Sequence, residues 1–368
     1  MPTDTPDTLR FLSQADAIEA GASDMSRCVD QMERVFELYD EDRVIMGGAG
    51  QYLHGHMTTF PSDLSDDEAE TLRSGSRFGA MPAYVGGEIE TIGVKWYGSV
   101  TPRADETAAP ESPPLLVLSD PETGRPEVVM DGSIVSTMRT GAMAGLGARY
   151  LQGERARTAS VIGPGRVGQA SVLGLDAALP SLDAVRLYHP DIEYAKAVRS
   201  AVAERVSTTV TATDSMEHAV RGADVTVAAA SRNPSPRIDP SWLTGDSTVI
   251  QLGDLRVPLD AFDDDRIFCD IPRHPLEFET QVGWDFTRAF TEAIESDDGE
   301  IRLSDVRALH ELVGGTDTAP TDGVSILSSL GLPMEDVAWG TEIYRTAVAQ
   351  DLGQQLLQRS EPYFSTPS

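Results

Sequence analysis

Lysine is almost missing from this sequence of 368 residues. Of its 29 basic side chains two are lysines, Lys95 and Lys196, and the rest are arginines. Cysteine is as scarce, because Cys28 and Cys269 are the only two, and their separation fits no metal site, so we expect two reduced, inert thiols. No apolar run is longer than a strand, which excludes a helix that spans a bilayer.

The amino-terminal sequence also lacks the features of a secretory signal. The segment "MPTDTPDTLR" is polar and acidic, with neither a basic region nor an apolar one. Together with the reduced thiols, this composition predicts a cytoplasmic protein.

Acidic side chains outnumber basic ones by 59 to 29, so the net charge is -30. Such a charge repels nucleic acid and anionic membranes at long range, and we exclude both as partners. We interpret acidic turns such as "SDLSDDEAE" (62–70) and "DAFDDDR" (260–266) as a halophilic coat, because concentrated salt screens the repulsion. Attraction of a cationic substrate is the alternative interpretation.

The sequence pattern changes near residue 158. Before that point the turns predict antiparallel strands, and after it short apolar strands alternate with helix-length segments, which predicts a parallel sheet. Near the end, the segment "GVSILSS" predicts a strand, and residues 332–357 predict a long helix. We therefore predict an α/β protein with a Rossmann-type dinucleotide-binding domain and a mixed α+β domain formed from both chain ends. The predicted boundaries are 151–320 for the first domain and 1–150 with 321–368 for the second.

The clearest motif is a glycine-rich loop in "TASVIGPGRVGQA" (158–170). Its glycines form G-x-G-x-x-G between an apolar strand and a helix, where they permit a tight turn, the approach of a pyrophosphate and close helix–strand packing. A second strand, "AVRLYHPD", follows at the expected spacing, so the motif predicts dinucleotide binding rather than a simple turn. The candidate cofactor-binding residues in the loop are Gly163, Pro164, Gly165, Arg166, Val167 and Gly168.

The end of the second strand leaves the choice between NAD and NADP open. An acid at this place usually binds the ribose hydroxyls, but here the strand ends in His189, with Asp191 two residues later. Asp191 would favour NAD, whereas His189 with Arg166 would accept a 2′-phosphate and favour NADP. We lean to NAD because a carboxylate lies close by; an exposed turn is the alternative role of His189.

Six segments resemble, in the same order, segments of the ornithine cyclodeaminase/mu-crystallin family. The resemblance extends from about residue 12 to about 357, and its first two segments are similar to the subgroup that contains amino-acid cyclodeaminases and opine-type dehydrogenases. The segments are "MPAYVGG" (81–87), "GVKWYGS" (93–99), "LSDPETGRP" (118–126), "STMRTGAMAGLGARYL" (136–151), "VIGPGRVG" (161–168) and "DGVSILSSLGLPMEDVA" (322–338).

This resemblance implies a homodimer with NAD or NADP as cofactor. Its active site would lie between the dinucleotide domain and the other domain, which would bind substrate and form the dimer. Lys95 and Arg139 would hold the α-carboxylate of the substrate, and Asp254 in "QLGD" would serve its amino group and proton transfers. Further candidates are Met81 and His56 for the substrate, and Ser112, Thr140, Ala229, Ala230 and Ser231 for the cofactor.

The chemistry of these three side chains fits such roles. A buried lysine requires an anion, and Arg139 lies among small and apolar neighbours, so it requires one too. Asp254 follows a parallel strand, at the edge where open α/β sheets bind ligands. The structural alternatives are an internal Lys95–Glu ion pair, a capping or domain-bridging Arg139, and an Asp254 that caps the next turn.

Some positions depart from the family pattern. Glu111 replaces a basic residue before Ser112, in a loop that normally reaches toward the cofactor. His54 and His56 lie where cyclodeaminases tend to have an arginine, and either histidine would contact substrate or simply pack. Gly79 occupies the place of a glutamate in ornithine cyclodeaminase, which weakens ornithine as the substrate.

The implied chemistry is hydride transfer between Cα of an amino acid and a nicotinamide. We expect an NAD(P)-dependent, ornithine cyclodeaminase-like enzyme, in which the imine cyclises with loss of ammonia and recovers the hydride. An amino-acid or opine-type dehydrogenase, or an imine (ketimine) reductase, is the alternative. A non-catalytic NADPH-binding protein similar to mu-crystallin is a further one. We expect no metal.

Overall fold

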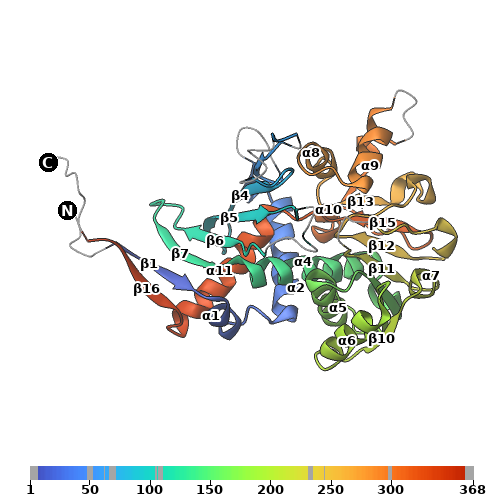
Figure 1. Cartoon of the computed structure of the whole chain (residues 1–368), viewed down its shortest axis with the longest axis horizontal. Coiled ribbons are helices and arrows are strands. Elements are labelled where there is room, and N and C mark those ends of the chain that lie inside the picture. Colours follow the sequence, from blue (N-terminus) through green and yellow to red (C-terminus); the bar gives the residue numbers. More distant parts are fainter. Residues whose placement is uncertain are drawn as a thin grey trace.

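The computed structural model describes residues 7–47, 53–61, 63–65, 72–103, 106, 111–230, 235–243, 245–296 and 301–360. They form two eight-stranded sheets, one mostly from the chain ends and the other from the middle of the chain (Figure 1). The predicted α/β class, with a Rossmann-type half and a mixed half, is confirmed.

The first sheet is mainly antiparallel and has the strand order β16-β1-β7-β6-β5-β4-β2, with β3 beside β4. Alternate residues of β4 and β5 are buried beneath helix α11 (Pro333–Ala349), as a half-covered sheet requires. Strands β1 and β16 project from the body as a two-stranded arm (Figure 1). The strands are β1 (Asp7–Leu12), β2 (Val44–Met46), β3 (His56–Thr59), β4 (Arg77–Val85), β5 (Thr91–Ser99), β6 (Leu115–Ser119), β7 (Pro126–Asp131) and β16 (Gln354–Arg359).

The last helix is shorter than the sequence predicted. We expected it to reach residue 357, but α11 ends at Ala349 and β16 follows. Asp351 and Gly353 have positive φ angles of 54° and 83°, which a right-handed helix does not allow. The turn lets the chain return along β1, which is antiparallel to β16.

The second sheet is parallel throughout, with the order β10-β9-β8-β11-β12-β15-β13-β14. The first five strands follow the Rossmann order, and several are buried along their whole length because helices cover both faces. The strands are β8 (Thr158–Ile162), β9 (Ala184–Tyr188), β10 (Thr209–Thr213), β11 (Val225–Ala228), β12 (Thr248–Gln251), β13 (Ile267–Cys269), β14 (Arg307–Ala308) and β15 (Ser325–Ser328).

Strand β15 corrects the second predicted boundary. The sequence assigned 321–368 to the half made from the chain ends, but β15 lies between β12 and β13 of the parallel sheet. The chain therefore leaves this sheet after Ser328, and residues 329–332 lead straight into α11. This connection places the start of α11 at the carboxyl edge of the parallel strands.

Helix α4 (Gly132–Leu151) holds the two halves together by packing on α5 (Arg166–Ala178). The contact is close because glycines face each other: a Cβ on Gly145 would lie 2.3 Å from the carbonyl oxygen of Gly174. Any larger side chain would force the helices apart. The small residues of "RTGAMAGLG" thus set α4 directly against the helix of the glycine loop.

The remaining helices pack around these layers. They are α1 (Gln14–Glu19), α2 (Met25–Asp40), α6 (Ile192–Ala203), α7 (Met216–Val220), α8 (His274–Gln281), α9 (Asp285–Glu295) and α10 (Leu309–Val313). Within the ranges given above, none of the helices combines the length and apolarity needed to cross a bilayer. The same ranges hold no group of three or more His, Cys, Asp or Glu side chains suited to a metal, and Cys28 and Cys269 are buried, free thiols.

Candidate functional site

A cleft of about 790 Å³ opens at the carboxyl ends of β8, β9, β11 and β12. The strand order reverses between β8 and β11, and at such a point open α/β sheets bind ligands. Gly163 has a φ of 83°, and a Cβ there would lie 2.5 Å from Cα of Ala230, so the turn requires glycine. The predicted residues that line the cleft are Gly163, Gly165, Arg166, Val167, His189, Ala229 and Ala230.

Other predicted cofactor residues lie around this cleft. Gly168 is buried beneath the loop, where a Cβ would lie 2.4 Å from the carbonyl oxygen of Gly163, so it serves close helix–strand packing, and Pro164 is buried as well. Ser231 lies outside the described residues. Ser112 and Thr140 line a smaller cavity of about 190 Å³ together with Arg166 and Val167.

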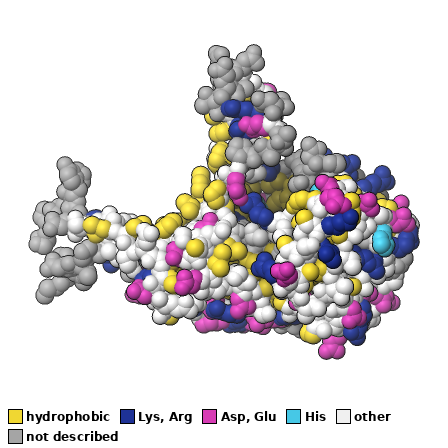
Figure 2. Space-filling view, turned by 60° about the horizontal axis from the view of Figure 1, so that its bottom comes forward, with side chains coloured by type: hydrophobic (Ala, Val, Ile, Leu, Met, Phe, Trp, Pro, Cys, Tyr) yellow, Lys and Arg dark blue, Asp and Glu magenta, His cyan; other side chains and the backbone are white. Residues whose placement is uncertain are grey.

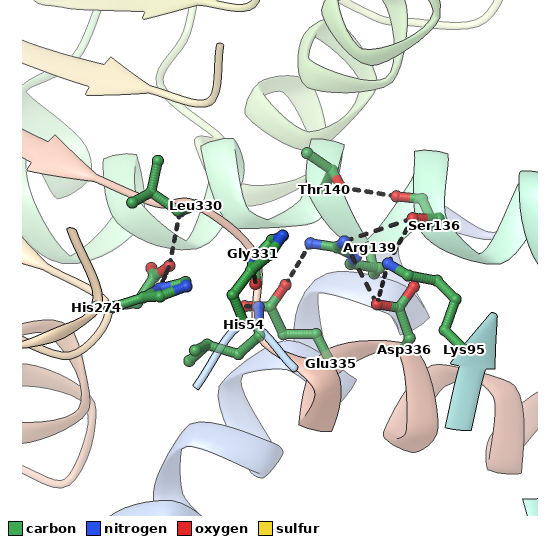
Figure 3. A network of polar contacts seen from close by, with 12 residues as sticks. His54, Lys95, Ser136, Arg139, Thr140, His274, Leu330, Gly331, Glu335 and Asp336 are labelled. Atoms are coloured by element: carbon green, nitrogen blue, oxygen red, sulfur yellow. Dashed lines mark hydrogen bonds and ion pairs between the residues drawn. The ribbon is translucent and has the colours of Figure 1, made fainter. Parts of the chain in front are cut away.

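Lys95 and Arg139 converge on one carboxylate (Figure 3). Lys95 Nζ lies 2.7 Å and Arg139 Nη2 3.3 Å from the same oxygen, Oδ2 of Asp336, and Arg139 Nη1 lies 2.7 Å from Glu335 Oε2. Both cations are nearly inaccessible, with exposed fractions of 5 % and 6 %. The internal ion pair that the sequence offered as an alternative is therefore present, but its acid is Asp336 and not the glutamate that we expected.

Opposing effects set the charges of this cluster. Burial lowers the pKa of Lys95 to about 8, although the negative charge of Asp336 favours the protonated ammonium and so acts in the opposite direction. Burial would raise the pKa of Asp336, but the attraction of Arg139 and Lys95 together holds it below its usual range. Burial raises the pKa of Glu335. Asp336 is thus an anion shared by two cations, and Glu335 is a second carboxyl group beside Arg139.

Ser136 on α4 connects this cluster to the cofactor loop. Its Oγ lies 3.2 Å from Lys95 Nζ and 3.4 Å from Arg139 Nη2. The same residue lines the smaller cavity beside Arg166 and Val167. Ser136 therefore contacts both cations and also lines a cavity that the glycine loop borders.

Tyr97 occupies the space next to Gly79. The two residues are cross-strand partners in β4 and β5, and a Cβ on Gly79 would lie 2.6 Å from the Tyr97 ring. Where ornithine cyclodeaminase has a glutamate, this chain therefore has a phenol, and burial raises its pKa to about 12. Met81, a predicted substrate contact, is buried directly opposite Lys95 in the same pair of strands.

The two candidate histidines lie in different environments. His54 is buried, with Nδ1 3.2 Å from the carbonyl oxygen of Gly331 and Nε2 3.4 Å from Tyr97 Oη. His56, the residue that we predicted as a substrate contact, has an exposed side chain on β3. The geometry thus favours His54 over His56 as the histidine at the site.

Asp254 is 1 % exposed and makes several hydrogen bonds. Its Oδ1 accepts from the amides of Leu255 and Asp285, both at 2.9 Å, so it holds the start of the distant helix α9, whereas the structural alternative had been a cap of the next turn. Its Oδ2 accepts from Ser235 Oγ at 2.7 Å, and Ser235 lines the dinucleotide cleft. The carboxylate thus reaches the cleft through one hydroxyl.

Sequence reasoning missed a second polar cluster beside Gly331. Asp270 and His274 are buried, His274 Nδ1 lies 3.9 Å from Asp270 Oδ2, and His54 stacks on His274. Within the described part of the chain, Asp270 Oδ1 and both ring nitrogens of His274 have no hydrogen-bond partner. Burial raises the pKa of Asp270 to about 8 and lowers that of His274 to about 3.

The missed residues left weak signals in the sequence. Glu335 and Asp336 are adjacent acids in the otherwise apolar segment "GLPMEDVAWG", which indicates buried cation partners. Asp270 directly follows a short apolar strand, as Asp254 does, and the same rule on carboxyl strand ends applies to both.

The profile of the ornithine cyclodeaminase/mu-crystallin family matches residues 22–351. The chain belongs to this family. Among its relatives, N-((2S)-2-amino-2-carboxyethyl)-L-glutamate dehydrogenase of Staphylococcus aureus is 24% identical over 285 residues, 75% of this chain and 81% of the relative.

Solved structures of the family share the fold. Thermococcus litoralis Δ1-pyrroline-2-carboxylate reductase, in complex with NADH and L-proline, has a TM-score of 0.77 at 17% identity, covering 95% of this chain and 100% of the other. An archaeal alanine dehydrogenase dimer with bound NAD has a TM-score of 0.73 at 22% identity, covering 97% and 100%.

Proposed function

We propose that this family member is an NAD(P)-dependent oxidoreductase that acts at Cα of an amino acid or of the corresponding imine. The observation that carries the proposal is the convergence of Lys95 and Arg139 on Asp336, next to a cavity that the glycine loop borders. The relatives agree with it, since the Staphylococcus aureus protein is a dehydrogenase and the Thermococcus litoralis structure is that of a reductase.

The cleft fits a dinucleotide in its chemistry. Gly163 allows the tight turn, and Gly165 has nothing within 4 Å of a would-be Cβ, so a pyrophosphate has room to reach the backbone there. Thr140 and Ser112 add hydroxyls in the adjoining cavity. A bound nicotinamide would exchange a hydride with Cα of the substrate.

The two buried cations would bind the α-carboxylate and fix the orientation of Cα. Asp336 keeps Lys95 and Arg139 charged and close together before substrate arrives, at a place that excludes water. An entering carboxylate would then meet donors that are already positioned, which lowers the entropic cost of binding. Met81, opposite Lys95, would form an apolar wall of this pocket.

Asp254 would serve as the acid or base, with Ser235 between it and the cleft. Ser235 Oγ lies 2.7 Å from Asp254 Oδ2 and 2.8 Å from Asp285 Oδ2. A hydroxyl donates one proton at a time, so Ser235 can pass a proton from one carboxylate to the other. Asp285 is partly exposed, which would connect buried Asp254 with solvent.

The side chain of Tyr97 favours a dehydrogenase or imine reductase over a cyclodeaminase. A neutral phenol fills the space of the acid that a distal amine would need, since Gly79 itself leaves no room for a larger residue. Cyclodeamination remains the second candidate because, among the residues that the structure describes, Asp270 Oδ1 is a buried carboxyl oxygen without a partner, and neither ring nitrogen of His274 has one. A substrate amine would supply such a partner.

One assay separates these activities. The purified protein is incubated in high salt with NAD⁺ or NADP⁺ and a panel of amino acids, while reduced nicotinamide and ammonia are followed together. Both products indicate a dehydrogenase, and ammonia alone indicates a cyclodeaminase. Oxidation of NADH or NADPH by a cyclic imine indicates an imine reductase, whereas its oxidation by a keto acid with an amine is the reverse reaction of a dehydrogenase. Absence of turnover in both directions would contradict the proposal.

The uncovered face of the first sheet supports the predicted homodimer. Its outward side chains are mostly apolar although the chain is strongly acidic, and Trp96 is 52 % exposed. Figure 2 shows hydrophobic side chains gathered in a band beside the β1/β16 arm. Residues that share this face are Ala80, Pro82, Ile92, Val94, Trp96, Leu115, Val117 and Val129.

We therefore expect Trp96→Asp to convert the dimer into a monomer, because it places a charge within an apolar interface. Sedimentation velocity in high salt measures the change. Val348→Asp is the matched control, since Val348 is 47 % exposed on α11 and lies outside the apolar face. A monomeric wild-type protein would contradict the prediction.

A further inference from the structure

The dinucleotide cleft differs in charge from the rest of the molecule. The sequence has 59 acidic residues, yet among the residues that the structure describes no Asp or Glu lines the cleft. The basic side chains in this lining are Arg166, Arg237 and His189. An acidic protein that keeps acids out of one cleft has a site suited to an anion.

The carboxylate nearest to the second strand is engaged elsewhere. Asp191 is the N-cap of α6, and its Oδ1 accepts from the amides of Glu193 at 3.0 Å and Tyr194 at 3.3 Å. Its side chain is exposed and is not part of the cleft lining. Our lean to NAD depended on this carboxylate reaching the ribose, and its capping role gives it a different purpose.

His189 takes the place of the usual acid, and one hydrogen bond decides which of its ring nitrogens can donate to a ligand. The amide of Asp191 donates to His189 Nδ1 at 3.1 Å. Because an amide N–H only donates, Nδ1 must accept, and the proton of the neutral ring lies on Nε2. The contact of Nδ1 with the Asp191 carbonyl oxygen at 3.2 Å is then not a hydrogen bond. His189 therefore presents a donor, with its ring against that of Tyr194.

We propose that the cofactor is NADP(H), and that His189 Nε2 donates a hydrogen bond to its 2′-phosphate. The inference rests on the proposed function, because it takes the cleft as a dinucleotide site. A ribose 2′-hydroxyl is best held by an acceptor, which is why NAD sites place a carboxylate there. A phosphate requires donors, and this end of the cleft supplies a donor and no acid.

Arg166 is the second group suited to the phosphate end of the cofactor. It lines the cleft, and its only ion pair in the described chain is with Glu111. Both partners are more than 70 % exposed, so this ion pair contributes little to stability. The guanidinium of Arg166 can therefore turn to an incoming phosphate. Glu111 itself lines a separate cavity next to the cleft.

Adenosine fragments test the proposal without any turnover. Competition of 2′,5′-ADP and of 5′-AMP against a fluorescent reduced dinucleotide gives the affinity of each at constant ionic strength. We expect 2′,5′-ADP and NADPH to bind at least about tenfold more tightly than 5′-AMP and NADH, as one charge-assisted hydrogen bond would give. Equal affinities, or tighter NADH, would overturn the proposal. Binding of neither dinucleotide would overturn the proposed function instead.

Two variants assign the preference to one residue. His189→Asp should reverse it in favour of NADH, because it replaces a donor by an acceptor that repels phosphate. Asp191→Asn is the matched control: its amide oxygen can still cap α6, so the ratio of the two affinities should stay the same. An unchanged ratio in His189→Asp would refute the role of His189, and a change in Asp191→Asn as large as that expected for His189→Asp would assign the preference to residue 191 instead.

Discussion

The dinucleotide cleft and the Lys95–Arg139 cluster handle anions in opposite ways. The cleft is open, with exposed cations and no lining acid among the described residues, so a bound anion meets donors directly. The cluster is closed, and each cation already has an internal carboxylate. The first arrangement costs little stability, whereas the second depends on partners that come from β5, α4 and α11.

Removing one cation from each region should change the free energy of unfolding by very different amounts, and this is the largest effect that we expect. Arg139→Leu leaves Glu335 and Asp336 buried with one cation fewer, so we expect a loss of about 3–5 kcal/mol in the free energy of unfolding. Arg166→Leu should change it little, because its ion pair is exposed. Denaturant unfolding in high salt measures both. Equal effects would abolish the contrast between the two regions.

Proton loss from Lys95 should weaken substrate binding but not cofactor binding. Its pKa is about 8, so the affinity for the substrate carboxylate should fall as pH rises through that value, approaching tenfold per unit. The stability effect has the opposite sign. Between pH 8 and the unfolded value near 10.5, the unfolded chain binds more protons at Lys95, so this group's contribution to the free energy of unfolding rises with pH.

Substrate titrations across pH 6.5–9.5 measure this fall in affinity, which forms the alkaline limb of the pH profile. Lys95→Arg is the control, since an arginine stays protonated, and the limb near pH 8 should disappear in it. Cofactor affinity should be flat across the same range in both proteins. A wild-type limb that persists in Lys95→Arg would assign the titration to another group.

A smaller loss of stability is expected at Gly79, which packs against Tyr97. Gly79→Ala should lower the free energy of unfolding by about 1–3 kcal/mol, because the new Cβ would lie 2.6 Å from the Tyr97 ring. Tyr97→Ala in the same chain should suppress this cost, so the double variant should be no less stable than Tyr97→Ala alone. Additive losses in thermal or denaturant unfolding would show that Tyr97 does not fill this space.

The two regions also differ in how far the sequence alone predicts them, because one is built from neighbouring residues and the other from distant ones. The glycine loop is local: its strand, its turn and the start of its helix lie within residues 158–170, and their spacing alone indicated the fold and the cleft. Lys95 was noticed because a lysine is out of place in an apolar strand. Its partner Asp336 lies 241 residues further along the chain, and no local pattern reports such a pairing.

Local conformations decided the other differences. The final helix ended early because Asp351 and Gly353 adopt positive φ, although the apolar pattern continued to residue 357. His54 rather than His56 reaches the site because the chain places it against Gly331 and Tyr97. Asp191, a candidate ribose ligand in the sequence, also caps the start of α6, a role that we did not predict.

Binding of substrate and of cofactor to Lys95→Met tests the central claim most directly. With the amino acid identified by turnover, its dissociation constant is measured by titration of the cofactor-loaded protein, and that of the cofactor separately. We predict that substrate binds about a hundredfold more weakly than to the wild type, and that cofactor affinity is unchanged. Substrate affinity equal to that of the wild type would contradict the claim that this ammonium holds the carboxylate.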